Sequence, residues 1–408
     1  MASFIIDGGR PLSGTVKVSG SKNAALPVIF ASLTARGVST FFGLPDILDV
    51  RCALDIISCF GAMVTRLGDV TYIDTRELRD SFVPISLTSR LRASSYLYGA
   101  CLARFGRAAL SSPGGCNFSP RPIDLHIYAA ECLGARLDGE ELRAEGLSGA
   151  VINLRLPSVG ATVNALIMAA SAEGETLIKG AAREDHIDAL IEYLVSAGAL
   201  ILREGDVIRV VGAELGGGEV KIPPDPIEAG TYLALSCITG GEVGVTGIEK
   251  ESLSSFFSPL ERAGACVKEE RGALYLSSPP DSYVELVTAP HPGFPTDLGP
   301  VTVPLLSQGA GGMIRECVWP ERFGYLSALE RAGIRSERFG SYAKIYPSSP
   351  IGAHTTAPDL RGGAALLITA LAAKGKSVIA SAETVLRGYE APVRKLSSLG
   401  ASVRIEEK

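Results

Sequence analysis

One short step recurs six times along the chain, each time at the end of an amphipathic stretch. It is a glycine followed by alanine or, once, by isoleucine, and it begins at Gly61, Gly134, Gly198, Gly264, Gly333 and Gly400. The successive intervals are 73, 64, 66, 69 and 67 residues. A near-constant spacing of this size is typical of stacked supersecondary units, and glycine is the usual residue where a helix ends. The chain therefore predicts six copies of one unit.

A second glycine precedes each step and closes an alanine-rich apolar segment. These glycines are Gly37, Gly106, Gly174, Gly240, Gly309 and Gly375. The segments 161–172 and 363–373 are apolar on nearly every helical face, which is typical of a buried helix. After each Gly-Ala step come two short strands and a turn, most clearly at 200–203 and 207–211. We interpret the unit as β-α-β-α-β-β, which places the chain in the α/β (α+β) class.

The two ends of the chain predict how the units are grouped. The sixth copy stops at Lys408 without room for its last strand, whereas an orphan strand, Phe4–Asp7, opens the chain. The economical interpretation is that the first strand completes the sixth unit. One domain then holds residues 22–229, and the other holds 1–21 plus 230–408. The chain crosses between them near 19–21 and 223–226, a pair of connections that suits a hinge.

Composition excludes several kinds of partner and site. The net charge is −5 without any basic run, which argues against nucleic acid and anionic membranes. Neither a signal peptide pattern nor an apolar span of membrane length is found, so we expect a cytoplasmic protein. The eight cysteines form no CxxC pair, as in a protein with reduced thiols. The four histidines show no metal-ligand spacing, so no metal is expected.

One cysteine differs from the others in its surroundings. Cys116 follows two glycines in the Gly- and Pro-rich segment 112–126, and Arg121 comes five residues later. A loop thiol beside a fixed positive charge can have a lowered pKa and can act as nucleophile or proton donor. From the spacing alone, an incidental cysteine on a surface loop is an equally good interpretation.

Further motifs along the whole chain resemble those of the enolpyruvyl transferases, in particular those that act on UDP-N-acetylglucosamine. They are the segments 19–27, 91–94, 113–126, 158–162, 182–184, 288–297, 359–361 and 387–390. The shikimate branch of that superfamily carries a different lysine motif and no such cysteine loop. The resemblance implies two inside-out α/β barrels, each with pseudo-three-fold repeats, that close over a cleft. It also implies a monomer without metal or cofactor.

The activity implied by this resemblance moves the enolpyruvyl group of phosphoenolpyruvate to the 3′-hydroxyl of UDP-N-acetylglucosamine and releases phosphate. In the cell this is the first committed step of peptidoglycan precursor synthesis, which links it to cell wall biogenesis, cell shape and cell division. The reaction passes through a tetrahedral addition intermediate. Two alternatives stay open at this point. One is a paralogue acting on another uridine nucleotide alcohol such as UMP, and the other is an inactive ligand-binding homologue.

The resemblance also assigns residues to the reaction. Phosphoenolpyruvate contacts are carried over to Lys22, Asn23, Arg121, Arg322, Arg361 and Arg387. Catalytic roles are carried over to Lys22, to Cys116 as general acid, to Asp297 as the carboxylate at the attacking hydroxyl, and to Asp359. For any single arginine, a solvated surface charge is the simpler interpretation. Asp297 and Asp359 each precede an apolar run, so each is also a candidate helix cap.

Nucleotide-sugar contacts are implied for a longer set of residues. These are Asn23, Arg92, Arg121, Pro122, Ile123, Asp124, Leu125, Ser158, Val159, Gly160, Asp297 and Val318. Residues 158–160 precede a buried helix, and a helix amino terminus suits a diphosphate, whereas Asp124 is also a candidate helix start. Four positions depart from the commonest family pattern, namely Leu48, Leu156, Pro226 and Pro320.

Overall fold

The computed structural model describes residues 2–110, 113–115 and 121–407. The chain divides into unit 1, Met1–Ser19 with Pro224–Lys408, and unit 2, Gly20–Pro223. Next to the crossings, the backbone amide of Asp225 donates to the carbonyl of Ser19 (2.9 Å) in unit 1. In unit 2 the amide of Ser21 donates to the carbonyl of Pro223 (2.7 Å). The two crossing segments are thus held to each other on either side of the boundary.

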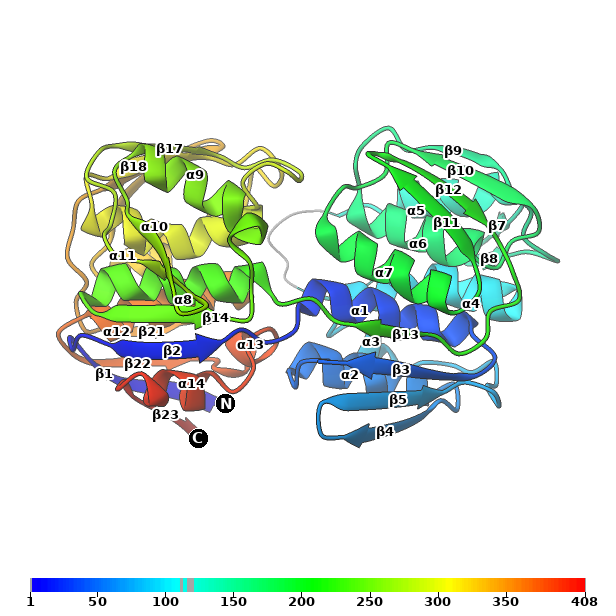
Figure 1. Ribbon diagram of the computed structural model, residues 1–408, viewed down its shortest axis with the longest axis horizontal. Coiled ribbons are helices and arrows are strands. Elements are labelled where there is room, and N and C mark those ends of the chain that lie inside the picture. Colours follow the sequence, from blue (N-terminus) through cyan, green and yellow to red (C-terminus); the bar gives the residue numbers. More distant parts are fainter. Residues whose placement is uncertain (1, 111–112, 116–120, 408) are drawn as a thin grey trace. The chain divides into compact units, whose positions relative to one another are not determined.

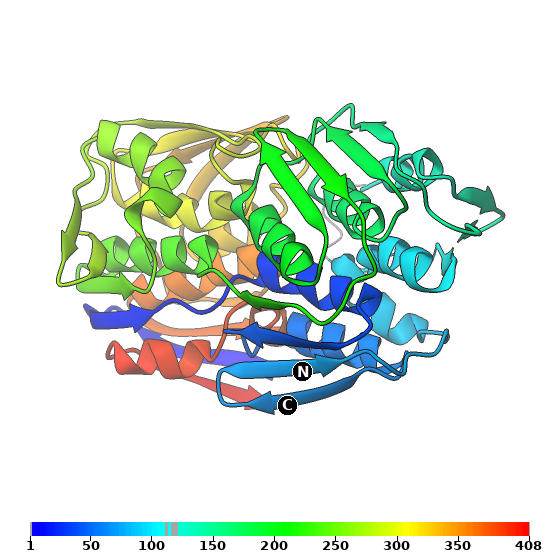
Figure 2. The same ribbon diagram turned by 45° about the vertical axis from the view of Figure 1, so that its right-hand side comes forward.

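Within the described residues, each unit has three inner helices that are buried along most of their length. They are α1 (Lys22–Ala31), α4 (Leu97–Phe105) and α6 (Val159–Ala169) in unit 2, and α8 (Pro226–Thr239), α10 (Gly299–Gln308) and α12 (Leu360–Ala372) in unit 1. In unit 1 each inner helix contacts the other two, and in unit 2 α4 contacts both α1 and α6. The predicted apolar segments therefore form helices inside both units, in agreement with the views of Figures 1 and 2.

In the part of the chain that the structure describes, six further helices each end just before one of the six Gly-Ala or Gly-Ile steps. They are α2 (Leu48–Ser58), α5 (Asp124–Cys132), α7 (Asp185–Ser196), α9 (Ser254–Arg262), α11 (Leu326–Arg331) and α14 (Pro392–Ser398). All six step glycines have positive φ, between 91° and 125°. This left-handed conformation is easy only for glycine, so it explains why glycine recurs there. The helix ends predicted from the repeat are confirmed.

The second set of glycines is less uniform than predicted. Gly106 and Gly240 cap α4 and α8 directly in the left-handed conformation. Gly37, Gly174 and Gly375 lie beyond the ends of their helices, at the entrance to the next strand. The prediction that each glycine of this set closes a helix is therefore wrong for those three, because short turns intervene before the strand begins.

Three four-stranded sheets surround the inner helices of unit 1. In hydrogen-bonded order they are β21 (His354–Thr356), β22 (Gly375–Ala380), β1 (Ala2–Gly8) and β23 (Ser402–Glu407); β15 (Val267–Glu270), β16 (Ala273–Leu276), β14 (Glu242–Thr246) and β2 (Ser13–Lys17); and β17 (Val284–Val287), β18 (Gly312–Arg315), β20 (Tyr342–Tyr346) and β19 (Arg335–Phe339). The first strand, β1, is antiparallel to both β22 and β23, with Phe4 opposite Ile379 and Ile405. It completes the sixth unit, as the sequence predicts.

Unit 2 has the same arrangement with one difference. Its sheets are β11 (Leu200–Glu204), β12 (Val207–Val211), β10 (Glu175–Lys179) and β9 (Val151–Asn153); β13 (Glu219–Lys221), β3 (Val38–Phe42), β5 (Val70–Asp74) and β4 (Met63–Leu67); and β6 (Arg107–Ala109), β8 (Glu141–Arg143) and β7 (Arg136–Asp138). The last has three strands among the described residues, because helix α3 (Ile85–Thr88) and a 3-10 turn, η2 (Arg92–Tyr96), precede α4 in place of a strand.

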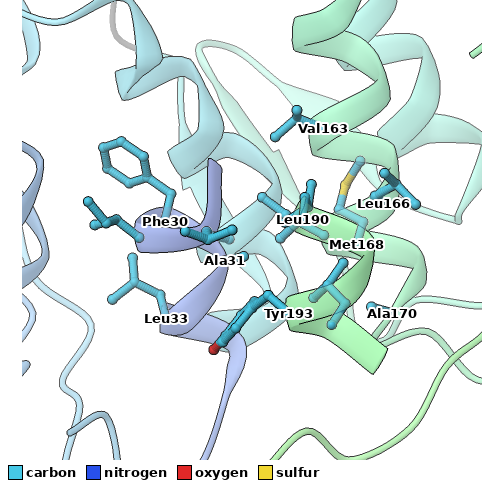
Figure 3. Packing of buried hydrophobic residues seen from close by; sticks show 14 of the residues in the cluster. Phe30, Ala31, Leu33, Val163, Leu166, Met168, Ala170, Leu190 and Tyr193 are labelled. Atoms are coloured by element: carbon cyan, nitrogen blue, oxygen red, sulfur yellow. The ribbon is translucent and has the colours of Figure 1, made fainter. Parts of the chain in front are cut away.

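In unit 2, residues from different repeats pack into one hydrophobic core. Phe30 and Ala31 of α1 lie in one cluster with Met168 of α6 and with Leu190 and Tyr193 of α7 (Figure 3). The Tyr193 hydroxyl is fully buried but bonds to the Ser39 hydroxyl at 2.8 Å, which offsets the cost of burying it. In the described part of the chain, none of the helices has the length and hydropathy that a membrane crossing requires.

Candidate active site

A buried cluster of one carboxylate and two arginines lies in unit 1. Asp297 stands in a 3-10 turn, η4 (Thr296–Leu298), ahead of α10. Its Oδ1 accepts from Nη1 of Arg322 at 2.7 Å, and its Oδ2 accepts from Nε of Arg361 at 3.0 Å. The arginine side chains are 5% and 2% exposed, whereas that of Asp297 is 27% exposed. The carboxylate is therefore the member of the cluster that solvent or a ligand can reach.

The alternative interpretation of Asp297 as a helix cap is wrong. The N-cap of α10 is Leu298, and no side chain makes a capping bond there. Both carboxylate oxygens of Asp297 bind guanidinium groups instead. Charge pairing with two buried cations is a stronger interaction than a cap on an exposed turn, so the fold uses this residue to hold the arginines.

Arg361 is the more deeply buried of the two arginines. Its guanidinium carbon lies 5.6 Å from the centre of the Tyr389 ring. Within the described part of the chain, its Nη1 and Nη2 atoms meet no acceptor in hydrogen-bond geometry. Burial alone would lower the pKa of Arg361, but Asp297 and other negative groups outweigh it and raise that pKa. A permanently charged group with two buried donors to spare is suited to a planar anion such as a carboxylate.

Asp359 is placed by the start of α12. Its Oδ1 accepts from the backbone amides of Arg361 (2.9 Å) and Gly362 (3.0 Å). The helix-cap interpretation of Asp359 is therefore confirmed. The cap fixes the first turn of α12, and Arg361 is the second residue of that helix.

Arg387 follows a short helix, α13 (Glu383–Leu386), and is half-buried. The motif that it opens continues with Tyr389, whose hydroxyl bonds to the Thr231 hydroxyl of α8 at 2.8 Å. Since Tyr389 also lies under the guanidinium of Arg361, the motif containing Arg387 and the first turn of α12 are joined through this ring.

Lys22 is the first residue of α1 in unit 2, and Asn23 follows it. Both are half-buried. The ammonium of Lys22 lies 3.8 Å from the Asp49 carboxylate, which is in the first turn of α2 and is 4% exposed. The lysine is therefore held as a cation at the start of an inner helix, where the helix dipole also favours anions.

Arg92 and Arg121 lie together in unit 2. Nη2 of Arg92 donates to the backbone carbonyl of Arg121 at 2.7 Å. Burial lowers the pKa of Arg92, whereas burial raises the pKa of the neighbouring Tyr96 and Tyr98 to about 12. Among these neighbours the arginine is thus the charged group and both phenols stay neutral.

The glycines before the cysteine are explained by close backbone contact. A methyl group on Gly114 would overlap the carbonyl of Ser89, and one on Gly115 would come within 2.8 Å of Cβ of Arg92. The segment 113–115 therefore lies against the turn that carries Arg92. Cys116 itself lies outside the described residues.

Seven of the nucleotide-sugar candidates form two groups in unit 2, whereas Asp297 and Val318 of the same set lie in unit 1. Pro122, Ile123, Asp124 and Leu125 lead into α5, where Asp124 is the first helical residue and pairs with Arg155. Ser158 caps α6, and its hydroxyl accepts from the amide of Ala161 at 3.3 Å. Val159 and Gly160 are half-buried residues of its first turn. A side chain at 160 would meet the ring of His126 within 2.9 Å, so α5 and the start of α6 are in contact.

The sequence did not single out Glu316 or Thr296, both of which contact this site. Glu316 is 4% exposed and accepts hydrogen bonds from Thr296 and from the backbone of Val318. Its one signal in the sequence is its position six residues before Arg322; in the structure it directly follows β18. No group of three or more His, Cys, Asp or Glu side chains suited to a metal ion occurs in the described residues.

Comparison with known proteins identifies relatives over the full length. The family model for EPSP synthase (3-phosphoshikimate 1-carboxyvinyltransferase) matches residues 6–396. A protein of Halothermothrix orenii named UDP-N-acetylglucosamine 1-carboxyvinyltransferase is 42% identical over 412 residues, 99% of either chain. One of Streptococcus mutans, named UDP-N-acetylglucosamine 1-carboxyvinyltransferase 2, is 40% identical over 420 residues, 100% of either chain.

Solved structures agree on the fold. The enolpyruvyl transferase NikO from Streptomyces tendae superimposes with a TM-score of 0.89 at 26% identity, over 99% of either chain. EPSP synthase from Acinetobacter baumannii superimposes with a TM-score of 0.74 at 18% identity, over 100% of either chain. The second likeness concerns architecture alone, since so few residues are shared.

Proposed function

The chain belongs to the EPSP synthase family of 1-carboxyvinyltransferases, and within that family we propose that it transfers the enolpyruvyl group of phosphoenolpyruvate to the 3′-hydroxyl of UDP-N-acetylglucosamine. The acceptor is inferred from the names of relatives that share about two residues in five over the whole length. The reaction would be the first committed step of peptidoglycan precursor synthesis, carried out by a cytoplasmic monomer.

The observation that carries the proposal is the state of Arg361. Its side chain is 2% exposed, it is charged, and two of its nitrogens are buried without an acceptor among the described residues. Leaving such donors unsatisfied costs several kcal/mol in total, at roughly 1–3 kcal/mol for each group. The carboxylate of phosphoenolpyruvate has the planar two-oxygen shape that satisfies both nitrogens at once. Arg322 beside it suits the same anion.

Phosphate is the second anionic group of the donor substrate. We assign it to Lys22, Arg121 and Arg387, with Asn23 nearby on α1. Lys22 begins an inner helix, so its ammonium group and the free backbone amides at the start of that helix both attract the phosphate. We assign the nucleotide sugar to a longer set, namely Asn23, Arg92, residues 121–125, residues 158–160, Asp297 and Val318.

Proton transfer is assigned to two groups. In the addition step the sugar oxygen bonds to C2 of phosphoenolpyruvate, its proton leaves to Asp297, and a proton is added at C3. Cys116, outside the described residues, is the assigned donor of that second proton. In the elimination step a proton leaves C3 and the C–O bond to phosphate breaks. Asp297 suits its role because it is the exposed member of its cluster.

A phosphate-release assay tests the proposal. With phosphoenolpyruvate and UDP-N-acetylglucosamine we expect stoichiometric phosphate and a product heavier by one enolpyruvyl group in mass spectrometry. UMP serves as the comparison acceptor and should give no product. Turnover with UMP alone would replace the acceptor by another uridine nucleotide alcohol, and turnover with neither would contradict the assignment.

A further inference from the structure

Glu316 is a buried carboxylate in unit 1 whose two oxygens serve different neighbours. Its Oε1 accepts from the hydroxyl of Thr288 at 2.5 Å and from the backbone amides of Val318 and Trp319, both at 2.9 Å. Its Oε2 accepts from the hydroxyl of Thr296 at 2.7 Å. An ionised carboxylate with several donors satisfies the requirement that a buried charge be hydrogen-bonded.

The chemistry of these groups fixes the direction of the hydrogen bonds. An ionised carboxylate can only accept, so the single proton of the Thr296 hydroxyl points at Glu316. The lone pairs of that hydroxyl are then available to Arg322, whose Nη1 lies 3.0 Å away. The same nitrogen donates to Asp297 at 2.7 Å. Glu316 therefore orients Thr296, and Thr296 orients the arginine that holds Asp297.

A second connection runs through the backbone. The amides of Val318 and Trp319 are held by Oε1 at the start of the segment that ends at Arg322, where the amide of Arg322 donates to the carbonyl of Trp319 at 2.8 Å. Glu316 thus holds Arg322 in two ways. It binds the backbone segment that leads to Arg322, and through Thr296 it positions the guanidinium group of Arg322. Misplacing reacting groups by about 1 Å can cost roughly a hundredfold in rate.

We propose that Glu316, acting through Thr296, is the positioning residue that sets the location of Arg322 and Asp297 for catalysis. The inference rests on the proposed function, since it concerns the same site. Glu316 does not reach the reacting atoms itself. It controls the site through the hydroxyl of one neighbouring threonine and through the backbone of one loop.

The chain offers a matched control for this relay. Thr288 and Thr296 each donate one hydroxyl hydrogen bond to Glu316, but only Thr296 also accepts from Arg322. Replacing Thr288 by valine removes one of three donors to Oε1 and also the acceptor of the Cys317 amide, but it leaves the two backbone amides on Oε1 in place. Replacing Thr296 by valine removes the contact that joins Oε2 to the arginine.

The experiment compares Thr296→Val, Thr288→Val, Thr296→Ser and Glu316→Gln in the full-length enzyme. We expect kcat to fall ten- to hundredfold in Thr296→Val and Glu316→Gln. Thr296→Ser, which keeps the hydroxyl, should regain activity to within about threefold of the unaltered protein, and Thr288→Val should stay within the same range. These ranges follow the cost of misplacing a reacting group. Equal losses of kcat in Thr288→Val and Thr296→Val, with equal losses of thermal stability, would overturn the proposal.

A binding measurement tests the positioning role of Glu316 independently of which acceptor the enzyme uses. Trp319 is the single tryptophan of the chain, and its amide is bonded to Glu316. Titration of its fluorescence with phosphoenolpyruvate alone should give at least a tenfold weaker Kd for Thr296→Val than for Thr288→Val. This result would stand even if UDP-N-acetylglucosamine proved to be the wrong acceptor. Identical Kd values in the two variants would refute the positioning role.

Discussion

The two units share one architecture but differ sharply in what they bury. Of the described residues below about a tenth exposed, unit 1 contains six charged ones: Asp225, Glu228, Glu316, Arg322, Asp359 and Arg361. Unit 2 contains one, Asp49, and otherwise buries neutral polar groups such as Asn164 and His126. The repeat therefore determines where helices and strands lie, but not which chemistry they carry.

The difference is concentrated where the inner helices begin. In unit 1 an aspartate stands at or just before each of these starts: Asp225 before α8, Asp297 before α10 and Asp359 before α12. In unit 2, Ser21 precedes α1, the 3-10 turn before α4 begins at Arg92, and Ser158 precedes α6. The residues just before the inner helices are thus acids in unit 1 and hydroxyl residues or a cation in unit 2. Buried charges are costly without partners, so unit 1 satisfies them with its own arginines and lysine, with backbone amides and with threonine hydroxyls.

The largest expected effect is the loss of kcat in Asp297→Asn of unit 1, which we compare with the same exchange, Asp49→Asn, in unit 2. Asp297→Asn removes the proton acceptor and the negative charge between two buried guanidinium groups. We expect kcat to fall by roughly 10³-fold, within the range for loss of an acid–base group. Asp49→Asn removes the charge 3.8 Å from one lysine. It should change kcat by no more than about tenfold, since it moves no proton.

Steady-state phosphate release at saturating substrates measures both variants. Circular dichroism checks that each is folded, because either change disturbs an ion pair. A loss of kcat in Asp49→Asn as large as that in Asp297→Asn would break the comparison, since it would place a catalytic carboxylate in unit 2 as well.

The sequence predicts the architecture well because the repeat is a local property. All six helix ends follow from glycines that need a left-handed backbone, and the hairpin 200–211 follows from its turn. The pairing of the first strand follows from counting strands within one unit. These features depend on neighbouring residues or on the period of the chain, so periodicity alone finds them.

The site is predicted less completely, because its contacts join residues far apart in the chain. Asp297 binds one arginine 25 residues away and another 64 residues away. No local pattern distinguishes this carboxylate from a helix cap. The sequence does not reveal Glu316 for the same reason. Its carboxylate is buried and accepts hydrogen bonds from four backbone and side-chain donors, whereas in the sequence a lone glutamate after a strand is typical of a surface residue.

A second test concerns the pairing of the buried charges of unit 1. Nζ of Lys395 donates to Glu228 at 2.6 Å, and the two side chains are 12% and 2% exposed. Lys395→Met should cost about 3–5 kcal/mol because it leaves a buried carboxylate without its cation. The double variant Glu228→Gln with Lys395→Met should cost less than Lys395→Met alone, since no charge then remains buried.

Urea unfolding at two pH values measures this coupling. Burial raises the pKa of Glu228, so in Lys395→Met the carboxyl takes up a proton more readily and the stability loss should shrink as the pH falls. If the stability loss of the double variant equalled the sum of the losses measured for Lys395→Met and for Glu228→Gln separately, the two charges would act independently.

The smallest effect tests the neutral polar core of unit 2. His126 is 5% exposed, and its Nδ1 lies 2.7 Å from the amide nitrogen of Asn164, which donates to the neutral ring. Burial, aided by Arg92, lowers the pKa of His126 to about 4, whereas the unfolded value is about 6.5. Between these values the unfolded chain binds a proton that the folded chain does not. The free energy of unfolding should therefore fall as the pH is lowered from about 6.5 to about 4, by up to ~3 kcal/mol.

His126→Gln removes the titrating group and keeps an acceptor for Asn164. We expect this variant to be less stable than the unaltered protein at pH 7 but to lose less further stability between pH 6.5 and pH 4. The arginines of unit 1 do not titrate in this range, so the flattening isolates a property of unit 2. If His126→Gln showed the same pH slope as the unaltered protein, the acid sensitivity would have to come from the carboxylates of unit 1. The contrast between a neutral and a charged interior would then fail as an account of how the two units respond to pH.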